Sequence, residues 1–146
     1  MKALLCSIFL LCWVFPLSAQ ARYAVSEIPP DLLKNARAVV RAYELTFEVL
    51  NKGEAIQTEH KVLTLLNERA ADEREPVFYY WAFDKIEDIE ASVYDAEGKL
   101  VRHLKKKDVQ DVKPPEHFVN DLRTKLLQLP ARPYPYTIEY TLTRRI

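Results

Sequence analysis

Histidine and cysteine, the residue types that most often carry catalysis or bind metals, are few in this sequence. His60, His103 and His117 each stand without the short spacing to a second ligand that a zinc or iron site shows. We therefore expect no metal site. His60 shares one side of a strand pattern with Thr58 and Val62 and is expected to be half-buried, whereas His103 and His117 are expected at the surface or in loops.

Pairs of acidic residues could supply a different chemistry, because two carboxylates can divide the acid and base roles of a glycosidase. Asp84 with Asp88, and Asp108 with Asp111, lie at short spacings. A chain with 21 acidic residues forms such pairs by chance, and two glycines cannot build a phosphate-binding or dinucleotide-binding loop. We assign no catalytic residue, cofactor or metal ligand and expect that the protein is not an enzyme.

Both cysteines lie in an N-terminal segment that has the features of a cleaved secretory signal peptide. Lys2 is followed by an almost uninterrupted apolar run at 3–17, a length typical of a signal peptide and shorter than the ~20 residues of a membrane span. Ala19-Gln20-Ala21 then fits the small-x-small rule for cleavage. We assign residues 1–21 to the signal peptide, so the mature protein has no thiol and no disulfide.

The balance of charge excludes two classes of binding protein. The chain has 21 basic and 21 acidic residues, spread along its length, which argues against nucleic-acid binding and against attachment to membranes through basic residues. The basic run at 105–107 is followed at once by Asp108 and is interpreted as a solvated loop. Residues 22–146 are expected to form one exported domain, in the periplasm, in the cell envelope or outside the cell.

Residues 77–83, Val-Phe-Tyr-Tyr-Trp-Ala-Phe, predict a strand with aromatic side chains on both faces. Phe78 and Tyr80 would point to one face of the sheet, and Tyr79, Trp81 and Phe83 to the other. One set is expected in the core, and the other either packs under a neighbouring loop or domain or forms an exposed platform for a glycan, peptide or partner domain. With two tyrosines of a proline-rich corner, the candidate binding surface is Tyr79, Trp81, Phe83, Tyr134 and Tyr136.

Two glycines mark the hairpins that would position these residues. Gly53 lies between segments of alternating apolar and polar residues at 43–49 and 56–64, and Gly98 lies between a similar pair at 86–94 and 100–104. Each glycine is expected to supply the positive φ of a tight turn. The alternation at 43–49 predicts a strand with one buried face.

The remaining elements complete an all-β pattern. Residues 28–36 begin with prolines and an acid and predict a helix of one or two turns, followed by a strand from Ala38; a helix that continues to Arg41 also fits the apolar spacing. Further strands are expected at 122–129 and 137–143. The predicted fold is all-β, mainly antiparallel and sandwich-like, with one short N-terminal helix after the signal peptide.

Several short segments, taken in order and spacing, resemble the DUF3857 family across essentially the whole mature chain. They are Ile28–Ala36, Ala38–Arg41, Leu63–Glu68, Val93–Lys99, Lys106–Asp108, Asp121–Arg123 and Pro133–Tyr140. The resemblance implies an exported protein of a type found largely in Bacteroidetes, in which this β region precedes a transglutaminase-like domain. None of the matching segments is catalytic.

The sequence departs from that family pattern in two ways. It stops at Arg144-Arg145-Ile146, whereas the resemblance implies relatives that continue through more of the β domain, so residues 22–146 are expected to be a DUF3857-like domain that is incomplete at its C-terminal end. A transglutaminase-like site also needs a cysteine nucleophile activated by a histidine. The mature chain has no cysteine to serve there.

Two functions remain open at this point. The first is a noncatalytic structural or interaction module that supports, or presents substrate to, a transglutaminase-like catalytic partner. The second is a stand-alone cell-envelope module that binds a glycan or a peptide through the aromatic surface. We also expect the chain to self-associate through an exposed edge strand, because the apolar positions at 138–142 run almost to the C-terminus and would leave that strand uncovered.

The signal peptide leads to the first testable prediction. N-terminal sequencing of the exported protein should find Gln20 or Arg22 as the first residue, because the small residues before each satisfy the cleavage rule. A thiol reagent should label the precursor and leave the exported form unlabelled. Exported protein that begins at Met1, or that reacts with the reagent, would contradict the assignment.

Overall fold

The computed structural model of the protein describes residues 21–81, 83–112 and 122–146. The signal-peptide prediction, apart from Ala21, and the surface placement of His117 lie outside the described residues. The strands are β1 (Ala38–Asn51), β2 (Glu54–Leu65), β3 (Val77–Tyr80), β4 (Lys85–Tyr94), β5 (Leu100–Leu104), β6 (Gln110–Val112), β7 (Arg123–Leu126) and β8 (Tyr136–Arg145). The helical segments are η1 (Val25–Glu27), α1 (Pro30–Leu33), η2 (Glu68–Arg74) and η3 (Lys106–Asp108).

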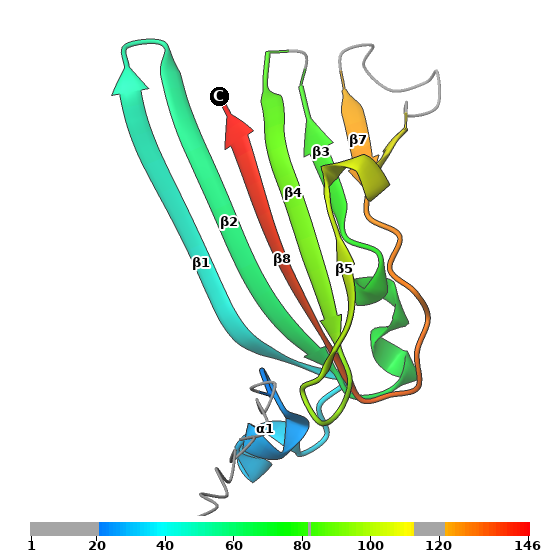
Figure 1. The fold of residues 1–146 in the computed structure, drawn as a ribbon. Coiled ribbons are helices and arrows are strands. Elements are labelled where there is room, and N and C mark those ends of the chain that lie inside the picture. The colour runs from blue at the N-terminus through cyan, green and yellow to red at the C-terminus, as the bar shows by residue number, and fades with distance from the viewer. Residues whose placement is uncertain (1–20, 82, 113–121) are drawn as a thin grey trace, which may run out of the picture.

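The strands form two antiparallel sheets, which confirms the all-β prediction (Figure 1). The large sheet has the order β1-β2-β8-β4-β5, and the small sheet has the order β3-β7-β6. The short helix α1 precedes β1, and β1 begins at Ala38 as the sequence predicts. The extension of the helix to Arg41 is therefore wrong. No helix among the described residues is long and apolar enough to cross a membrane.

The core lies between the small sheet and the middle of the large sheet. Phe78 of β3 packs edge-to-face on Tyr140 of β8, with ring centroids 5.2 Å apart and planes at 72°. Leu127, in the segment after β7, is fully buried. These contacts join one face of the large sheet to one face of the small sheet, and the core also contains Leu63, Leu65, Ile86, Ile89, Val93, Leu104, Leu129, Tyr136, Ile138 and Leu142.

β8 occupies the centre of the large sheet, so the prediction that the last strand has an uncovered edge is wrong. It pairs with β2 from Ile56–Arg145 to Leu65–Tyr136, and with β4 from Lys85–Arg145 to Tyr94–Thr137. The edges of this sheet are β1 and β5. The reason for the error is topological: strand order is set by contacts between distant segments, and closeness to the C-terminus does not place a strand at an edge.

Gly98 is the position where the backbone needs a glycine. Its φ is +82°, and an added Cβ would lie 2.6 Å from the carbonyl oxygen of Arg22. The N-terminal segment crosses the β4–β5 turn here, with Arg22 N donating to Gly98 O at 2.9 Å. Gly53 differs from the prediction, because its φ is outside the positive range and its Cβ position is open; the side chain of Asn51 accepts a bond from Gly53 N and closes that turn.

The two glycines form a matched pair for a stability test. Gly98→Ala should lower the free energy of unfolding by ~1–3 kcal/mol, because the new side chain must adopt a positive φ and displace the backbone at Arg22. Gly53→Ala should change it by less than ~0.5 kcal/mol. Urea unfolding of both variants and the parent measures the difference. Equal effects of the two substitutions would show that the N-terminal segment does not lie against this turn.

Candidate functional site

Four apolar side chains of β1 lie exposed on the surface, although their alternation predicts a buried face. Tyr43, Leu45, Phe47 and Val49 expose 56%, 55%, 58% and 68% of their area. The strand and its alternation are as predicted, but the prediction that this apolar face is buried is wrong. We call these four residues the apolar shelf.

The shelf is on the same face of the large sheet as the core. Leu45 pairs with Glu59 of β2, which pairs with the buried Leu142 of β8. Directly paired residues on neighbouring strands point to the same side of a sheet. The shelf therefore continues the core-facing surface of the large sheet beyond the area that the small sheet covers.

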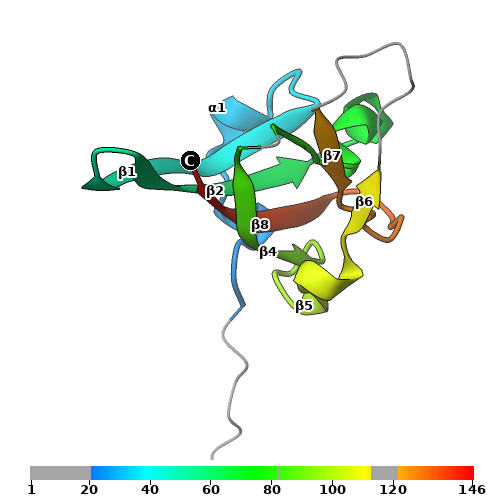
Figure 2. The same cartoon turned by 90° about the horizontal axis from the view of Figure 1, so that it is seen from above.

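The shelf stays open because the two sheets differ in width. The small sheet has three strands and the large sheet five. Its strand β3 lies over β8 through the Phe78–Tyr140 contact. Leu63 and Leu65 of β2 still belong to the core, whereas β1 and the part of β2 nearer the hairpin turn lie beyond the edge of the small sheet. Figure 2 shows the turn end of these two strands reaching out past the rest of the molecule.

A groove of about 510 Å³ separates β3 from β2 at the inner border of the shelf. Its lining includes Glu59, Lys61, Val77, Tyr79, Tyr140 and Arg144. The Tyr140 hydroxyl donates to Glu59 at 2.9 Å. Burial, together with the charge of Glu59, raises the pKa of Tyr140, so the hydroxyl stays protonated and keeps this hydrogen bond. Lys61 is held by Glu73 of η2 at 4.0 Å.

Strand β3 presents a free backbone edge to this groove. It pairs with β7 along Val77–Leu126 to Tyr80–Arg123, and it is the outer strand of the small sheet. β1 is likewise the outer strand of the large sheet. Unpaired N–H and C=O groups along an edge strand can accept a further strand. The shelf thus has a strand edge on each side.

The strand predicted at 77–83 is shorter in the structure, since β3 ends at Tyr80, but the aromatic residues from Phe78 to Phe83 alternate in exposure as the sequence predicts. Phe78 and Tyr80 are 6% and 9% exposed and belong to the core. Tyr79, Trp81 and Phe83 expose 59%, 49% and 95% of their area. The structure therefore places three of the predicted surface residues on the outside.

The two tyrosines of the proline corner do not join that surface. Tyr136 is 1% exposed and belongs to the core, so its assignment to a binding surface is wrong. Burial, with Tyr134 beside it, raises the pKa of Tyr136 to about 12. Tyr134 is half-buried and stacks on Tyr136 at 5.2 Å. Tyr136 begins β8 and Tyr134 lies two residues before it, whereas Lys85, two residues after Phe83, pairs with Arg145 at the other end of β8.

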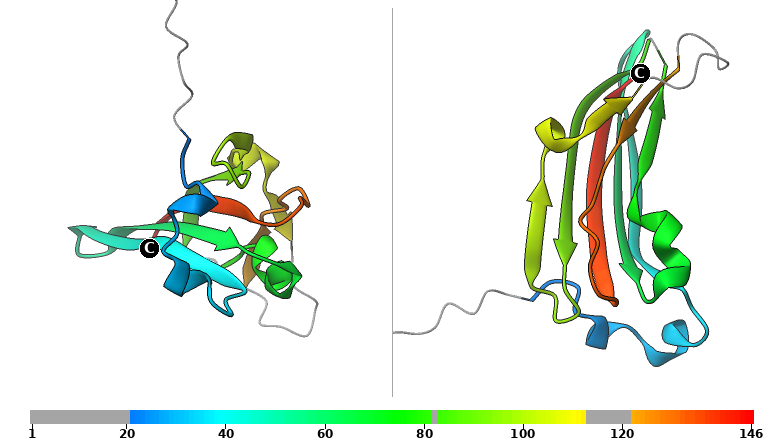
Figure 3. Two further views of the ribbon diagram at one scale, coloured as in Figure 1. Left: turned by 90° about the horizontal axis from the view of Figure 1, so that it is seen from below. Right: turned by 90° about the vertical axis from the view of Figure 1, so that its right-hand side faces the viewer.

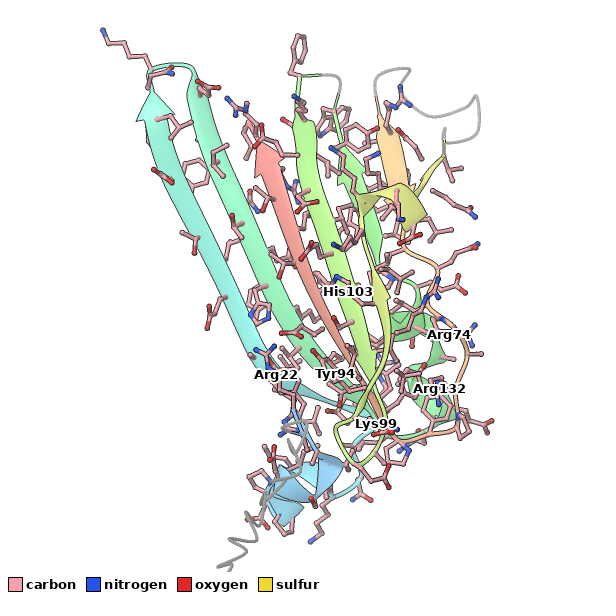
Figure 4. All side chains as sticks on the ribbon, viewed as in Figure 1. Arg22, Arg74, Tyr94, Lys99, His103 and Arg132 are labelled. Carbon is pink, nitrogen blue, oxygen red and sulfur yellow. The ribbon has the colours of Figure 1, made fainter. Side chains whose placement is uncertain are left out.

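The opposite face of the large sheet carries a polar cluster around Glu139. Its carboxylate accepts hydrogen bonds from Tyr94 at 2.6 Å and from Tyr23 at 3.0 Å, and lies 3.1 Å from Nε2 of His60 and 3.9 Å from Arg22. Figure 4 shows Arg22 and Tyr94 near the lower end of this sheet, and Figure 3 shows the N-terminal segment that brings Arg22 there. The cluster fastens the N-terminal segment to the sheet. Sequence reasoning missed it, because its members come from four separate segments.

The ionisation of Glu139 follows from these contacts. Burial alone would raise its pKa, but the hydrogen bonds from Tyr94, His60 and Tyr23 and the charge of Arg22 outweigh burial and hold the pKa below its ordinary value. The carboxylate is therefore ionised at neutral pH and satisfied by its neighbours. Across residues 21–81, 83–112 and 122–146, no three His, Cys, Asp or Glu side chains are grouped to hold a metal ion.

Comparison with known proteins gives one family and one solved structure. Residues 51–146 match the model of a domain of unknown function with a solved structure, DUF3857. A crystal structure from Parabacteroides distasonis, described as that of a candidate protease, superposes with a TM-score of 0.64 at 15% identity, over 75% of this chain and 23% of the other. The chain thus spans less than a quarter of that protein, and the likeness shows a shared fold. No curated protein sequence matches.

The Glu139 cluster predicts a pH-dependent contribution to stability. Glu139→Gln should lower the free energy of unfolding by ~1–3 kcal/mol near neutral pH, because buried donors lose a charged acceptor. The pKa of this carboxyl is depressed in the folded state, so its stabilisation is present above the ordinary value of 4.5 and is lost as the pH falls through the folded pKa.

Urea unfolding from neutral to acidic pH should therefore show the parent and Glu139→Gln converging at low pH. Glu48→Gln on the exposed part of β1, opposite Ile56 and away from His60, removes the same charge outside the cluster and serves as the control. A constant difference between parent and Glu139→Gln at every pH would show that the carboxylate charge is not what holds the cluster.

Proposed function

The chain belongs to the DUF3857 family, and from that premise we propose that it is a noncatalytic, exported β-sandwich module that binds another polypeptide through the apolar shelf. The observation that carries this proposal is the exposure of Tyr43, Leu45, Phe47 and Val49 on the core-facing side of the large sheet. A contiguous apolar surface of this kind marks an interaction site in a folded protein.

The energy available at the shelf supports a docking role. Covering one large apolar side chain is worth roughly 1.5–3 kcal/mol relative to leaving it in water. Leu45 and Phe47 are adjacent on the same face and each is more than half exposed. The free edges of β1 and β3 add backbone hydrogen-bonding groups at both borders of the surface. Apolar burial and strand pairing together are the means by which sheets capture extended polypeptide.

The absence of cysteine from residues 13–146 supports a role without cysteine-based catalysis. A transglutaminase-like reaction would need a thiolate nucleophile, which a separate catalytic domain or protein would have to supply. The solved structure that shares this fold is described as a candidate protease and is much longer than this chain. A module that holds polypeptide beside such a catalytic domain would support the reaction or present its substrate.

A second candidate function rests on the other exposed surface. Tyr79, Trp81 and Phe83 favour a stand-alone envelope module that binds a glycan or peptide by stacking on aromatic rings. After removal of residues 1–21, Trp81 is the only tryptophan in the chain. Its fluorescence would therefore report directly on binding at this surface. A saturable change on titration with cell-wall glycans, unaffected by changes in the shelf, would favour this second function.

The shelf is tested by making it polar. The double variant Leu45→Thr/Phe47→Thr should bind less of an apolar fluorescent dye than the parent and keep its free energy of unfolding within ~0.5 kcal/mol, because exposed side chains contribute little to the fold. Leu142 lies in the same row across the sheet but is only 1% exposed. The comparison variant Leu142→Thr should therefore lower the free energy of unfolding by ~2 kcal/mol or more.

Dye fluorescence and urea unfolding give the two readings on the same samples. A loss of stability in the double variant as large as that of Leu142→Thr would show that the shelf belongs to the core of the isolated chain. The docking role would then be wrong.

A further inference from the structure

We propose that the groove between β3 and β2 binds an extended segment of another polypeptide, which adds one strand to the free edge of β3 and places an acidic side chain against Arg144. This inference rests on the proposed function, in which this face of the large sheet binds polypeptide, and it adds where the segment lies and which charge it carries. Three features support it: the backbone groups of β3 that face the groove, the length of the open edge, and the charges along the groove.

Val77 and Tyr79 direct their backbone groups away from β7 and toward the groove. In an antiparallel pair of strands, residues that exchange hydrogen bonds alternate with residues that do not. The backbone nitrogen of Leu127 donates to the carbonyl oxygen of Pro76 at 3.2 Å, so Pro76 and, two residues on, Phe78 are the bonded positions. The N–H and C=O groups of Val77 and Tyr79 therefore point outward, and both residues line the groove. These groups can pair with a further strand.

The open part of this edge is short, so it takes one extended segment of a few residues. β3 has four residues, and a strand rises by ~3.3 Å per residue. At the Val77 end, η2 already fills part of the layer beside β3, because its Glu73 lies 4.0 Å from Lys61 of β2. The groove that remains has a volume of about 510 Å³, within the ~300–1,000 Å³ of ligand pockets.

Arg144 brings a cation without a counter-ion to this groove. The residue is half-buried, and its Nε is buried without a hydrogen-bond partner among the described residues. The next residue, Arg145, is paired with two glutamates of its own chain. Glu59 lines the same groove, but it accepts the hydrogen bond of Tyr140 at 2.9 Å. A partly buried charge without a partner is costly, and a carboxylate that enters the groove would offset this cost.

The Val77 end of the groove carries the opposite charge. Asp72, Glu73 and Glu75 line it, and each is already paired with an arginine of the same chain. An acidic side chain of the bound segment would be repelled at this end and attracted at the Arg144 end. The groove therefore selects where in the segment the acid lies.

The direction of β3 places that acidic position beside Arg144. Phe78 lies over Tyr140, and Lys85, which follows β3 in the chain, pairs with the last residue of β8. β3 therefore runs toward the end of β8 that carries Arg144. A ligand residue opposite Tyr79 would point outward as Tyr79 does, and the residues on either side of it would point inward onto the large sheet. The inward residue nearer Arg144 carries the acid, and the other can be apolar, because it faces the inner border of the shelf.

Fluorescence anisotropy with two labelled peptides tests the charge. Both peptides are blocked at their ends and alternate threonine with valine; one central valine is replaced by glutamate in the first peptide and by glutamine in the second. The glutamate peptide should bind the exported protein at least ~10-fold more tightly, because hydrogen bonds to charged groups are the stronger ones. Arg144→Gln should remove this preference. Arg102→Gln, which removes the same charge from the exposed side of β5, should retain it.

A proline at residue 79 tests the added strand. Tyr79→Pro removes the N–H that faces the groove, at a place where an edge strand tolerates proline, and should weaken binding of the glutamate peptide at least ~10-fold. Tyr79→Ala keeps the N–H and should leave the affinity within about threefold of the parent. Urea unfolding checks that both variants fold. If Tyr79→Pro does not fold, N-methylation of the peptide at its threonines or at its valines removes the N–H groups of one edge at a time, and only one of the two should abolish binding.

The outcomes separate this inference from the proposed function. Equal binding of the two peptides, a preference that survives Arg144→Gln, or one that Arg102→Gln removes as well, overturns the acidic partner. Binding that neither Tyr79→Pro nor N-methylation weakens overturns the added strand, and a protein that binds neither peptide overturns the whole inference. In each of these cases the dye experiment on Leu45→Thr/Phe47→Thr decides the docking role of the shelf independently.

Discussion

The apolar contact between the two sheets, centred on β8, is the interaction on which the rest of the structure depends. β8 pairs with β2 on one side and β4 on the other, and its inward residues Ile138, Tyr140 and Leu142 form the middle of the core. Phe78 packs on Tyr140 and fixes β3 above β8. Because the small sheet extends from there toward β5, this one contact decides which half of the large sheet is covered and which half is left open.

The two faces of the large sheet consequently have different tasks. The inner face continues from the core into the apolar shelf. The outer face holds the Glu139 cluster, which gathers Tyr23, Tyr94 and His60 and fastens the N-terminal segment across the sheet. The outer face is therefore stabilised by polar contacts within the chain, whereas the inner face keeps apolar area for which the described residues provide no cover. This asymmetry favours a binding role for the inner face.

Local pattern predicted the elements better than it predicted their surroundings. Alternation and turn residues placed the start of β1 at Ala38 and both hairpins correctly, because these are decided by neighbours in sequence. Tyr136 was expected at the surface but is buried, and Phe47 was expected on a buried face but is exposed. Alternation shows that a strand has one apolar face, but what covers that face depends on strand order and sheet width. The Glu139 cluster could not be predicted for the same reason, because its members come from distant segments of the chain. Tyr23 and Glu139, for example, are 116 residues apart.

The composition of β1 is compatible with the proposed docking role. An edge strand that is apolar on one face and neutral on the other would pair with any available edge and aggregate. β1 combines its apolar residues with Glu44 and Glu48 on the opposite face, and these acids discourage unselective edge pairing with copies of itself. The apolar face remains free to pack against a second layer. Under the proposed docking role, such a strand would take partners that approach from the core side of the sheet, beside β3.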